Sequence, residues 1–274
     1  MDRYAVIGNP VAHSRSPQIH EAFARATGQK LTYERLPAPL DGFLATVESF
    51  ARAGGQGLNV TAPFKLEAFA LAGTHSARAK LTGAVNTLKR EGDGWFGDNT
   101  DGPGIVRDLT HNLGIALAAR DILVLGAGGA SRGIMSSVLA ERPRSLTVCN
   151  RTFAKAAAIA QLFAPYGPVA ATPPDALAGS SFDIVINATS AGLTDKSSPP
   201  WPATIVESGA FAYDMIYADT PTAFRAWAAA NGAAGTADGL GMLIEQAAES
   251  FFIWRGVRPD TAPIFPLLRP AGVG

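Results

Sequence analysis

A glycine-rich turn joins an apolar strand to a helix in the segment Leu123-Val124-Leu125-Gly126-Ala127-Gly128-Gly129-Ala130-Ser131-Arg132-Gly133. Such a turn can hold a dinucleotide pyrophosphate, because glycines let the backbone approach the phosphates and the helix N-terminus supplies N–H donors. Ser131 stands where the third glycine of G-x-G-x-x-G belongs, and a lone glycine pattern often marks only a turn. The flanking strand and helix nevertheless favour a Rossmann-like nucleotide-binding domain.

The sequence on both sides of this turn alternates between strand and helix patterns. From residue 121 on, strands are expected at 121–126, 145–149, 182–188 and 211–216, with helices at about 130–141, 152–164, 221–231 and 240–255. In the first half, strands are expected at 4–8, 31–36 and 57–61, followed by a hairpin around Gly92-Asp93-Gly94. A helix begins at Asp101, where we place a domain boundary. The alternation predicts the α/β class, with two α/β domains and a ligand-binding cleft between them.

Composition and charge exclude several classes of protein. The chain has 274 residues, of which 47% are hydrophobic and 17% charged, and its formal net charge is zero, so no basic stripe suggests nucleic acid. Residues 1–8 follow a strand pattern and show no signal-peptide h-region, and no apolar run is long enough to span a membrane. Cys149 is the only cysteine, which argues against a disulfide or a cysteine metal cluster. We expect a cytoplasmic protein with no metal site and no nucleic-acid or membrane partner.

The residues after the second strand of the Rossmann-like domain indicate which dinucleotide binds. NAD sites usually carry an acidic residue there, but this sequence has Asn150-Arg151-Thr152, followed by Lys155. Arg151 can grip a 2′-phosphate and Lys155 adds a positive charge, although either could be a plain surface charge. Their spacing from Gly126 fits the ribose-reading position, so we favour NADP. Asn187-Ala188-Thr189-Ser190-Ala191-Gly192 follows another apolar strand and could line the same site or simply end the strand.

Short polar segments mark the first domain. They are Gly8-Asn9-Pro10-Val11-Ala12-His13-Ser14-Arg15-Ser16-Pro17, Asn59-Val60-Thr61-Ala62-Pro63-Phe64-Lys65, Gly83-Ala84-Val85-Asn86-Thr87 and Gly97-Asp98-Asn99-Thr100-Asp101-Gly102. Their hydroxyls, amides, lysine and aspartate suit a small polyhydroxylated acid, which needs donors for its carboxylate and paired donors and acceptors for its hydroxyls. Each has a plainer interpretation: Ser16 and Asp101 as helix caps, and Lys65 as a solvated lysine on a first helical turn.

Taken together with the glycine turn, these segments resemble the shikimate dehydrogenase family. The resemblance extends over residues 4–258 and includes Asn150-Arg151-Thr152, Asn187 to Gly192, Tyr213-Asp214-Met215-Ile216-Tyr217 and Asp238-Gly239-Leu240-Gly241-Met242-Leu243, in the family's order. It implies an NADP-dependent oxidoreductase that reversibly reduces 3-dehydroshikimate to shikimate, in the pathway to aromatic amino acids. It also implies a substrate-binding domain formed by 1–101 plus 240–274 and an NADP-binding domain formed by 102–239.

The resemblance implies roles for individual residues. Lys65 and Asp101 would form the catalytic pair. Substrate would be bound by Ser14, Ser16, Asn59, Thr61, Asn86, Tyr217 and Gln246. NADP would be bound by Gly126, Ala127, Gly128, Gly129, Ala130, Asn150, Arg151, Thr152, Lys155, Thr189, Met215 and Gly239. The sequence departs from some family members at His75-Ser76-Ala77-Arg78, where those members carry an acidic cofactor contact.

Other functions remain open at this point. A quinate dehydrogenase or an NAD-dependent relative is the nearest, although Ser16, rather than threonine, favours shikimate. A non-catalytic ligand sensor on the same scaffold is disfavoured because Lys65 and Asp101 are both present. Another two-domain NADP enzyme, such as a folate dehydrogenase, is disfavoured by the serine pair and the segment 59–65. We expect a monomer or a homodimer.

Overall fold

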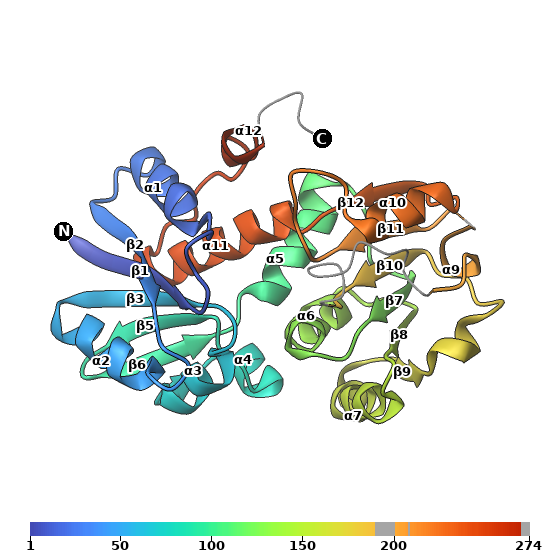
Figure 1. Ribbon diagram of the computed structural model, residues 1–274, viewed down its shortest axis with the longest axis horizontal. Helices are drawn as coiled ribbons and strands as arrows, with labels where there is room; N and C mark the ends of the chain where they lie inside the picture. The colour runs from blue at the N-terminus through green and yellow to red at the C-terminus, as the bar shows by residue number, and fades with distance from the viewer. Residues whose placement is uncertain (190–200, 208, 270–274) are drawn as a thin grey trace. The chain divides into compact units, whose positions relative to one another are not determined.

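The chain folds into two units, each built on a six-stranded sheet (Figure 1). This computed structural model describes residues 1–189, 201–207 and 209–269. Unit 1 comprises Met1–Gly104 together with the described residues from Ile244 on, and unit 2 comprises Ile105–Leu243. Two helices, α5 (Asp101–Arg107) and α11 (Leu240–Arg255), contain the points where the chain passes from one unit to the other.

The sheet of unit 1 is mixed. Its strand order is β2-β1-β3-β5-β6-β4, with β1 parallel to β2 and β3, and with β5 antiparallel to both β3 and β6. The strands are β1 (Asp2–Gly8), β2 (Leu31–Pro37), β3 (Gly55–Val60), β4 (Thr74–His75), β5 (Thr87–Glu91) and β6 (Gly94–Asp98). The expected hairpin is confirmed: β5 and β6 pair around Gly92, which adopts a positive φ of 58°.

Helices bury the apolar residues of this sheet. They are α1 (Ser16–Ala26), α2 (Phe43–Arg52), α3 (Lys65–Leu71), α4 (Ala77–Thr82), α12 (Ile264–Leu268) and the part of α11 from Ile244 on. Ile7 and Leu58 from the strands pack with Phe43 and Phe64 in one core cluster. Trp254 of α11 donates a hydrogen bond to the Leu88 carbonyl at 3.0 Å, which ties this late helix to β5.

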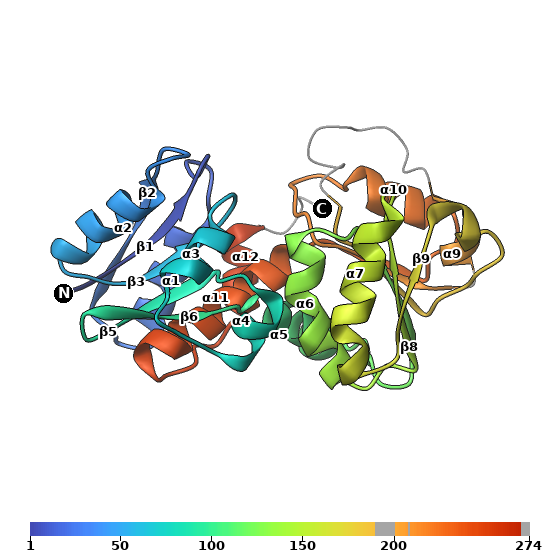
Figure 2. The same ribbon diagram turned by 90° about the horizontal axis from the view of Figure 1, so that it is seen from below.

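Unit 2 has the parallel sheet that the glycine turn predicts. Its strand order is β12-β11-β10-β7-β8-β9, and every pairing is parallel. The strands are β7 (Asp121–Leu125), β8 (Ser145–Cys149), β9 (Val169–Thr172), β10 (Ile184–Asn187), β11 (Phe211–Asp214) and β12 (Gly235–Ala237). The helices are α6 (Gly129–Ala140), α7 (Phe153–Phe163), α9 (Thr204–Glu207) and α10 (Ala223–Ala230), and Figure 2 shows α6 and α7 side by side against the strands.

The sequence pattern does not reveal the two edge strands of unit 2. β9 is the half-buried run Val169-Ala170-Ala171-Thr172, and β12 has only three residues, so neither carries a strong apolar signal. Neither strand alters the prediction for the site, because both lie at the margins of the sheet. No described helix is long and apolar enough to cross a membrane.

Candidate functional site

In unit 1 the polar segments gather at the carboxyl ends of β1 and β3. These neighbouring parallel strands lead into the turn that carries Ser14 and Ser16 and into the turn that carries Thr61. The two turns touch: Asn9 N–H donates to the Ala62 carbonyl at 3.1 Å. A Cβ on Gly8 would lie 2.4 Å from the Thr61 methyl, so only glycine allows this approach.

Lys65 and Asp101, which the resemblance implies are a catalytic pair, form an ion pair. Lys65 is the first residue of α3 and Asp101 the first residue of α5, and Lys65 Nζ lies 2.5 Å from Asp101 Oδ2. The aspartate side chain is only 11% exposed and the lysine side chain 30%. Asn86 Nδ2 donates to the other carboxylate oxygen at 2.8 Å, so hydrogen bonds fix both oxygens of Asp101.

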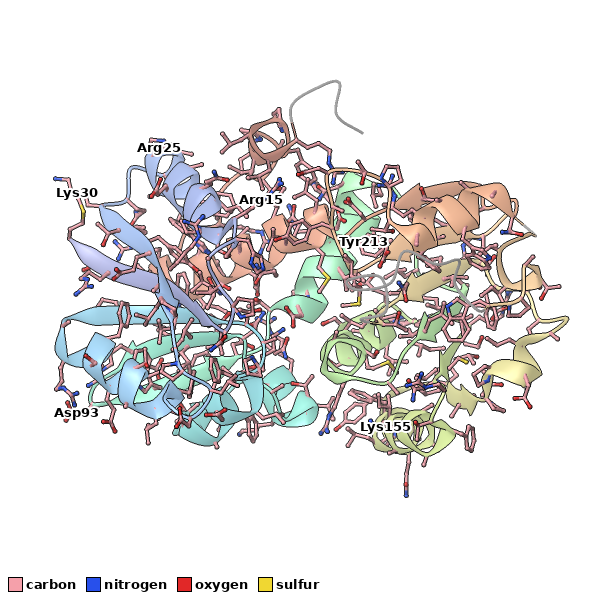
Figure 3. The ribbon with its side chains drawn as sticks, viewed as in Figure 1. Arg15, Arg25, Lys30, Asp93, Lys155 and Tyr213 are labelled. Atoms are coloured by element: carbon pink, nitrogen blue, oxygen red, sulfur yellow. The ribbon has the colours of Figure 1, made fainter. Side chains whose placement is uncertain are left out.

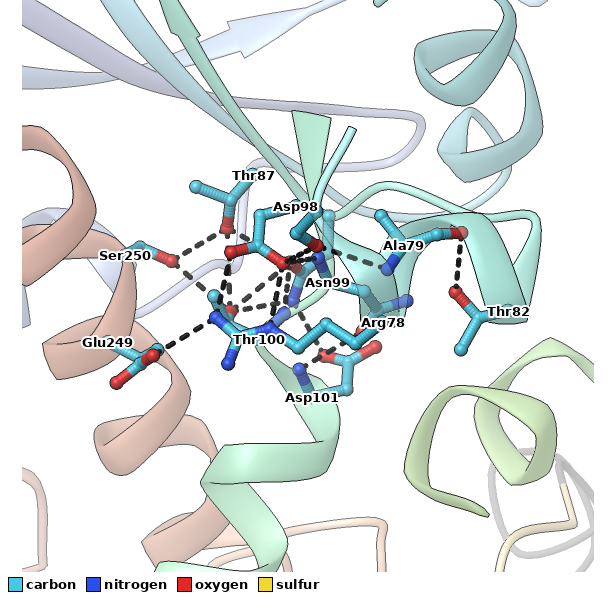
Figure 4. A network of polar contacts seen from close by, with 12 residues as sticks. Arg78, Ala79, Thr82, Thr87, Asp98, Asn99, Thr100, Asp101, Glu249 and Ser250 are labelled. Carbon is cyan, nitrogen blue, oxygen red and sulfur yellow. Dashed lines mark hydrogen bonds and ion pairs between the residues drawn. The ribbon is translucent and has the colours of Figure 1, made fainter. Parts of the chain in front are cut away.

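Asn86 belongs to a buried network that holds it in one orientation. Figure 4 shows Thr87, Thr100, Asp101 and Ser250 of this network. Asn86 Oδ1 accepts a hydrogen bond from Thr100 N–H at 2.8 Å and another from the Thr87 hydroxyl at 2.9 Å. The Thr87 and Ser250 hydroxyls lie 2.8 Å apart, and Thr100 donates to Gln246 Oε1 at 3.3 Å. The network therefore joins the β5–β6 hairpin to α11 within unit 1.

The charged side chains of Arg78, Asp98 and Glu249 form ion pairs beside this network. Arg78 donates to both carboxylate oxygens of Asp98 at 2.7 and 2.8 Å and to Glu249 at 3.0 Å, and Asp98 also accepts a hydrogen bond from Asn99 N–H at 2.7 Å. Burial lowers the pKa of Arg78, but the hydrogen bonds and charges of Asp98 and Glu249 outweigh this effect and raise the pKa. Arg78 thus orders the segment that leads into Asp101.

Ser16 does not cap the helix that follows it. The structure corrects this interpretation: Ser16 is already the first residue of α1, Arg15 occupies the cap position, and no side chain caps the helix. The Ser16 hydroxyl instead accepts a hydrogen bond from Ser14 Oγ at 3.1 Å. Arg35 donates two hydrogen bonds to the Ser14 carbonyl, at 2.6 and 2.9 Å, so this turn is held from β2.

Asn59 and Thr61 lie at the end of β3. Asn59 is buried, and its Nδ2 donates to Ser250 Oγ at 2.9 Å and to Thr87 Oγ1 at 3.3 Å. Thr61 is half-buried, and its backbone N–H donates to the Ile7 carbonyl at 3.0 Å. Of the substrate residues proposed from sequence, unit 1 therefore brings together Ser14, Ser16, Asn59, Thr61, Asn86 and Gln246, whereas Tyr217 belongs to unit 2.

In unit 2 the glycine turn stands at the carboxyl end of β7. Gly126 has a φ of 104°, and its N–H donates to the Cys149 carbonyl at 2.7 Å. A Cβ added to Gly128 or Gly129 would meet no atom within 4 Å, so the backbone at the N-terminus of α6 is open to a ligand. Ser131 is fully buried and donates to the Gly126 carbonyl at 2.8 Å, which explains how a serine replaces the third glycine.

The proposed 2′-phosphate residues follow β8 and are exposed. Arg151, Thr152 and Lys155 are all exposed, and Figure 3 shows Lys155 projecting outward from α7. Asn150 Nδ2 donates to the Thr152 carbonyl at 2.9 Å, which shapes the turn between β8 and α7. A cationic turn with no carboxylate at this strand end matches a phosphate rather than a free ribose hydroxyl.

Two further strand ends complete this edge of the sheet. Asn187 ends β10 and donates to Asp214 Oδ1 at the end of β11 at 3.0 Å, and its Oδ1 accepts from the Thr189 hydroxyl at 2.8 Å. A Cβ on Gly239 would lie 2.2 Å from the Met215 carbonyl oxygen, so only glycine fits there. Ser190, Ala191 and Gly192 of the predicted cofactor segment lie outside the described residues.

Sequence reasoning missed several members of the unit 1 network. Tyr33 and Ser250 lie outside the segments singled out from sequence, whereas Thr87 and Thr100 lie inside two of them without an assigned role; all four form hydrogen bonds with Asn59 or Asn86. Arg78 also received no role, and it bonds to Asp98 and Glu249. Ser250 follows Gln246 by one helical turn, and this spacing places both on one face of α11, so the helix pattern could have identified it. Tyr33 carried no such signal. Among the residues that the structure describes, no group of histidine, cysteine, aspartate and glutamate could hold a metal ion.

Three family models match parts of the chain. Residues 6–88 match a family model described as shikimate dehydrogenase substrate binding domain, 108–194 match shikimate / quinate 5-dehydrogenase, and 239–264 match shikimate 5'-dehydrogenase C-terminal domain. A shikimate dehydrogenase (NADP(+)) from Thioalkalivibrio sulfidiphilus is 55% identical over 271 residues, which cover 98% of this chain and 99% of the relative.

Solved structures resemble the chain over nearly its whole length. The Ael1 enzyme from Pseudomonas putida is 47% identical, with a TM-score of 0.94 and coverage of 98% of each chain. The shikimate 5-dehydrogenase from Thermus thermophilus, solved in complex with NADP(H) and shikimate, is 36% identical, with a TM-score of 0.85 and coverage of 96% of each chain.

Proposed function

The chain belongs to the shikimate dehydrogenase family, and we propose that it catalyses the reversible, NADP-dependent reduction of 3-dehydroshikimate to shikimate. The observation that carries the mechanism is the Lys65–Asp101 ion pair, set among buried amides and hydroxyls in unit 1. We propose unit 1 as the substrate-binding domain and unit 2 as the NADP-binding domain. We further propose a cytoplasmic enzyme that acts as a monomer or a homodimer.

Lys65 is the proposed proton donor. When a ketone is reduced, negative charge grows on its oxygen, and an ammonium at hydrogen-bond distance stabilises this charge and supplies the proton. In the oxidation direction the same nitrogen, as a neutral amine, accepts the proton from the hydroxyl. The position of Lys65 at the start of α3, held by Asp101, limits the directions in which its ammonium can point.

Asp101 is proposed to orient both Lys65 and the reacting hydroxyl. The carboxylate is held on one oxygen by Lys65 and on the other by Asn86. Its position on the first turn of α5 places the negative charge at the positive end of that helix. These contacts hold the carboxylate in one orientation, so Asp101 is proposed to act as a fixed acceptor.

The remaining polar groups of unit 1 are proposed to bind the rest of the substrate. Ser14 and Ser16 would donate hydrogen bonds to the carboxylate, and Asn59, Thr61, Asn86 and Gln246 would pair with the ring hydroxyls or the carboxylate. Hydroxyl and amide groups match a polyhydroxylated acid because each can both donate and accept. Tyr217 of unit 2 is proposed as an additional substrate contact.

The residues of unit 2 fit NADP. When bound, the nicotinamide cofactor supplies the hydride chemistry, while the protein binds and orients it. The N–H groups from Gly126 to Ala130 would bind the pyrophosphate, and Asn150, Arg151, Thr152 and Lys155 would bind the 2′-phosphate. Thr189, Met215 and Gly239 are proposed to line the path from the adenosine to the nicotinamide.

The test is a spectrophotometric assay of dinucleotide reduction by the purified protein. Shikimate and quinate are each supplied with NADP⁺ and with NAD⁺. We expect the highest kcat/KM for shikimate with NADP⁺. A protein that reduces NADP⁺ with neither acid, or that prefers quinate with NAD⁺, would contradict the proposal.

A further inference from the structure

Tyr33 lies between two sets of side chains that the proposed function assigns to the substrate. It stands in the middle of β2, its side chain is buried, and its phenol donates a hydrogen bond to Asn59 Oδ1 at 2.7 Å. Burial raises the pKa of Tyr33 well above its ordinary value, and the neighbouring Ser16 side chain acts in the opposite direction. The phenol therefore contacts the end of β3 at Asn59, and Ser16 lies beside it.

The contacts on each side of Tyr33 continue into the proposed site. Ser16 accepts a hydrogen bond from Ser14, so the two serines near the phenol are joined to each other. On the other side, Asn59 donates to Ser250, and this fixes which way its amide group faces. Because Tyr33 donates to the amide oxygen, the amide nitrogen is left to face Ser250.

Aromatic neighbours hold the Tyr33 ring independently of its hydroxyl. His20 stacks on it with 4.2 Å between ring centroids and 6° between ring planes, and Trp254 lies at 6.3 Å. In the described part of the chain neither ring nitrogen of His20 has a hydrogen-bond partner of normal geometry, so His20 contributes to this packing as a flat surface. Removing only the Tyr33 hydroxyl should therefore leave the ring in place.

We infer that Tyr33 is a positioning residue for the substrate, whose hydroxyl fixes the orientation of the Asn59 amide. This inference rests on the proposed function. Without the hydroxyl, Asn59 Oδ1 loses a buried partner, and its amide can rotate away from the orientation that binds a ring hydroxyl. Ground state and transition state lose the same contact, so KM for shikimate rises while kcat changes little.

The test compares Tyr33→Phe with Tyr4→Phe. Tyr4 is a matched control because it is buried in the same aromatic cluster and stacks on Trp254 at 4.7 Å, yet its phenol accepts a hydrogen bond from Arg255, outside the proposed site. For each variant we measure kcat, KM for shikimate and for NADP⁺, the melting temperature, and the Kd of shikimate by calorimetry. For Tyr33→Phe we expect a roughly tenfold rise in KM and Kd for shikimate, with kcat and KM for NADP⁺ within about twofold.

Several outcomes would overturn the inference. These are an unchanged KM and Kd for shikimate in Tyr33→Phe, an equal rise in Tyr4→Phe, or a loss confined to kcat. A wild-type protein that binds shikimate without oxidising it would contradict the proposed function alone, and the two Kd values would then decide the role of Tyr33. A wild-type protein that neither binds nor oxidises shikimate would overturn both.

Discussion

The two units present their functional groups in opposite ways. In unit 1 the groups are side chains, most of them buried, and each is held by other side chains: Asp101 by Lys65 and Asn86, and Asn59 by Tyr33 and Ser250. In unit 2 the groups are backbone N–H donors at an open helix N-terminus and the exposed cations Arg151 and Lys155. The proposed catalytic groups therefore belong to a buried network, whereas the proposed cofactor-binding groups lie on the surface.

This difference has an energetic consequence. A buried charged or amide side chain has a fixed orientation in a low-dielectric environment. Removing it leaves its hydrogen-bond partners unsatisfied and allows the reacting group to move. An exposed cation competes with water and salt, so its removal costs less. We therefore expect substitutions in the unit 1 network to have larger effects than substitutions in the cofactor residues of unit 2.

Lys65→Ala should produce the largest effect. We expect kcat to fall by roughly 10²–10⁴-fold, the usual contribution of a general acid–base group, while shikimate binding stays within a few-fold. The measurement is steady-state kinetics combined with calorimetric titration of shikimate. Near-normal turnover by this variant would show that Lys65 is not the proton donor. It would also contradict the expectation that substitutions in unit 1 have the larger effects.

The pH dependence of stability that comes from His20 tests whether the interior of unit 1 disfavours a charged side chain. Burial lowers the pKa of His20 to about 3, and the neighbouring Asn59 side chain partly opposes this shift. Because the unfolded chain binds this proton near its ordinary pKa of about 6.5, stability falls as pH drops from 7 toward 3. The loss contributed by His20 between pH 7 and pH 5 is ~2 kcal/mol.

The measurement is urea unfolding at pH 7 and at pH 5, for wild type and for His20→Phe. The free energy of unfolding should depend less on pH in the variant, by ~2 kcal/mol over this interval. His111→Gln is the control, because His111 is exposed. A pH dependence equal in all three proteins would show that His20 can be protonated in the folded state.

Arg151→Ala should weaken binding of NADPH without affecting NADH. We expect KM for NADPH to rise roughly tenfold, the order of one charge-assisted hydrogen bond to a phosphate at an exposed site. Arg120→Ala is a matched control, since Arg120 is also exposed but pairs with Asp183 in unit 2. Equal changes of KM for both dinucleotides would show that Arg151 does not read the 2′-phosphate.

Ser131→Ala should have the smallest effect. It removes the hydrogen bond to the Gly126 carbonyl but keeps the small side chain, at a cost of ~1 kcal/mol of stability. KM for NADPH should rise only a few-fold, because the backbone donors remain. Ser131→Gly restores the glycine of the G-x-G-x-x-G pattern. Kinetics equal to those of wild type would show that serine and glycine serve equally well at this position.

The elements with long apolar patterns were predictable from sequence, whereas the short strands at the edges of the unit 2 sheet were not. β7, β8 and α11 lie where their periodicity places them, whereas β9, rich in alanine, and the three-residue β12 give no comparable signal. At Ser16 the sequence instead predicts a feature, a helix cap, that the structure does not have. The sequence context of this serine is typical of an N-cap, yet α1 begins one residue earlier than that requires, and the Ser16 hydroxyl accepts a hydrogen bond from Ser14 instead.

The sequence by itself determined the order of strands and helices, the glycine turn after β7 and the cationic turn after β8, because each of these depends on residues adjacent in the chain. Only the tertiary structure decided that Tyr33, Asn59 and Ser250 share one hydrogen-bonded network, and that Asn86 holds Asp101. These contacts join residues far apart in sequence. They follow from how the sheet and α11 pack, and no local pattern records that packing.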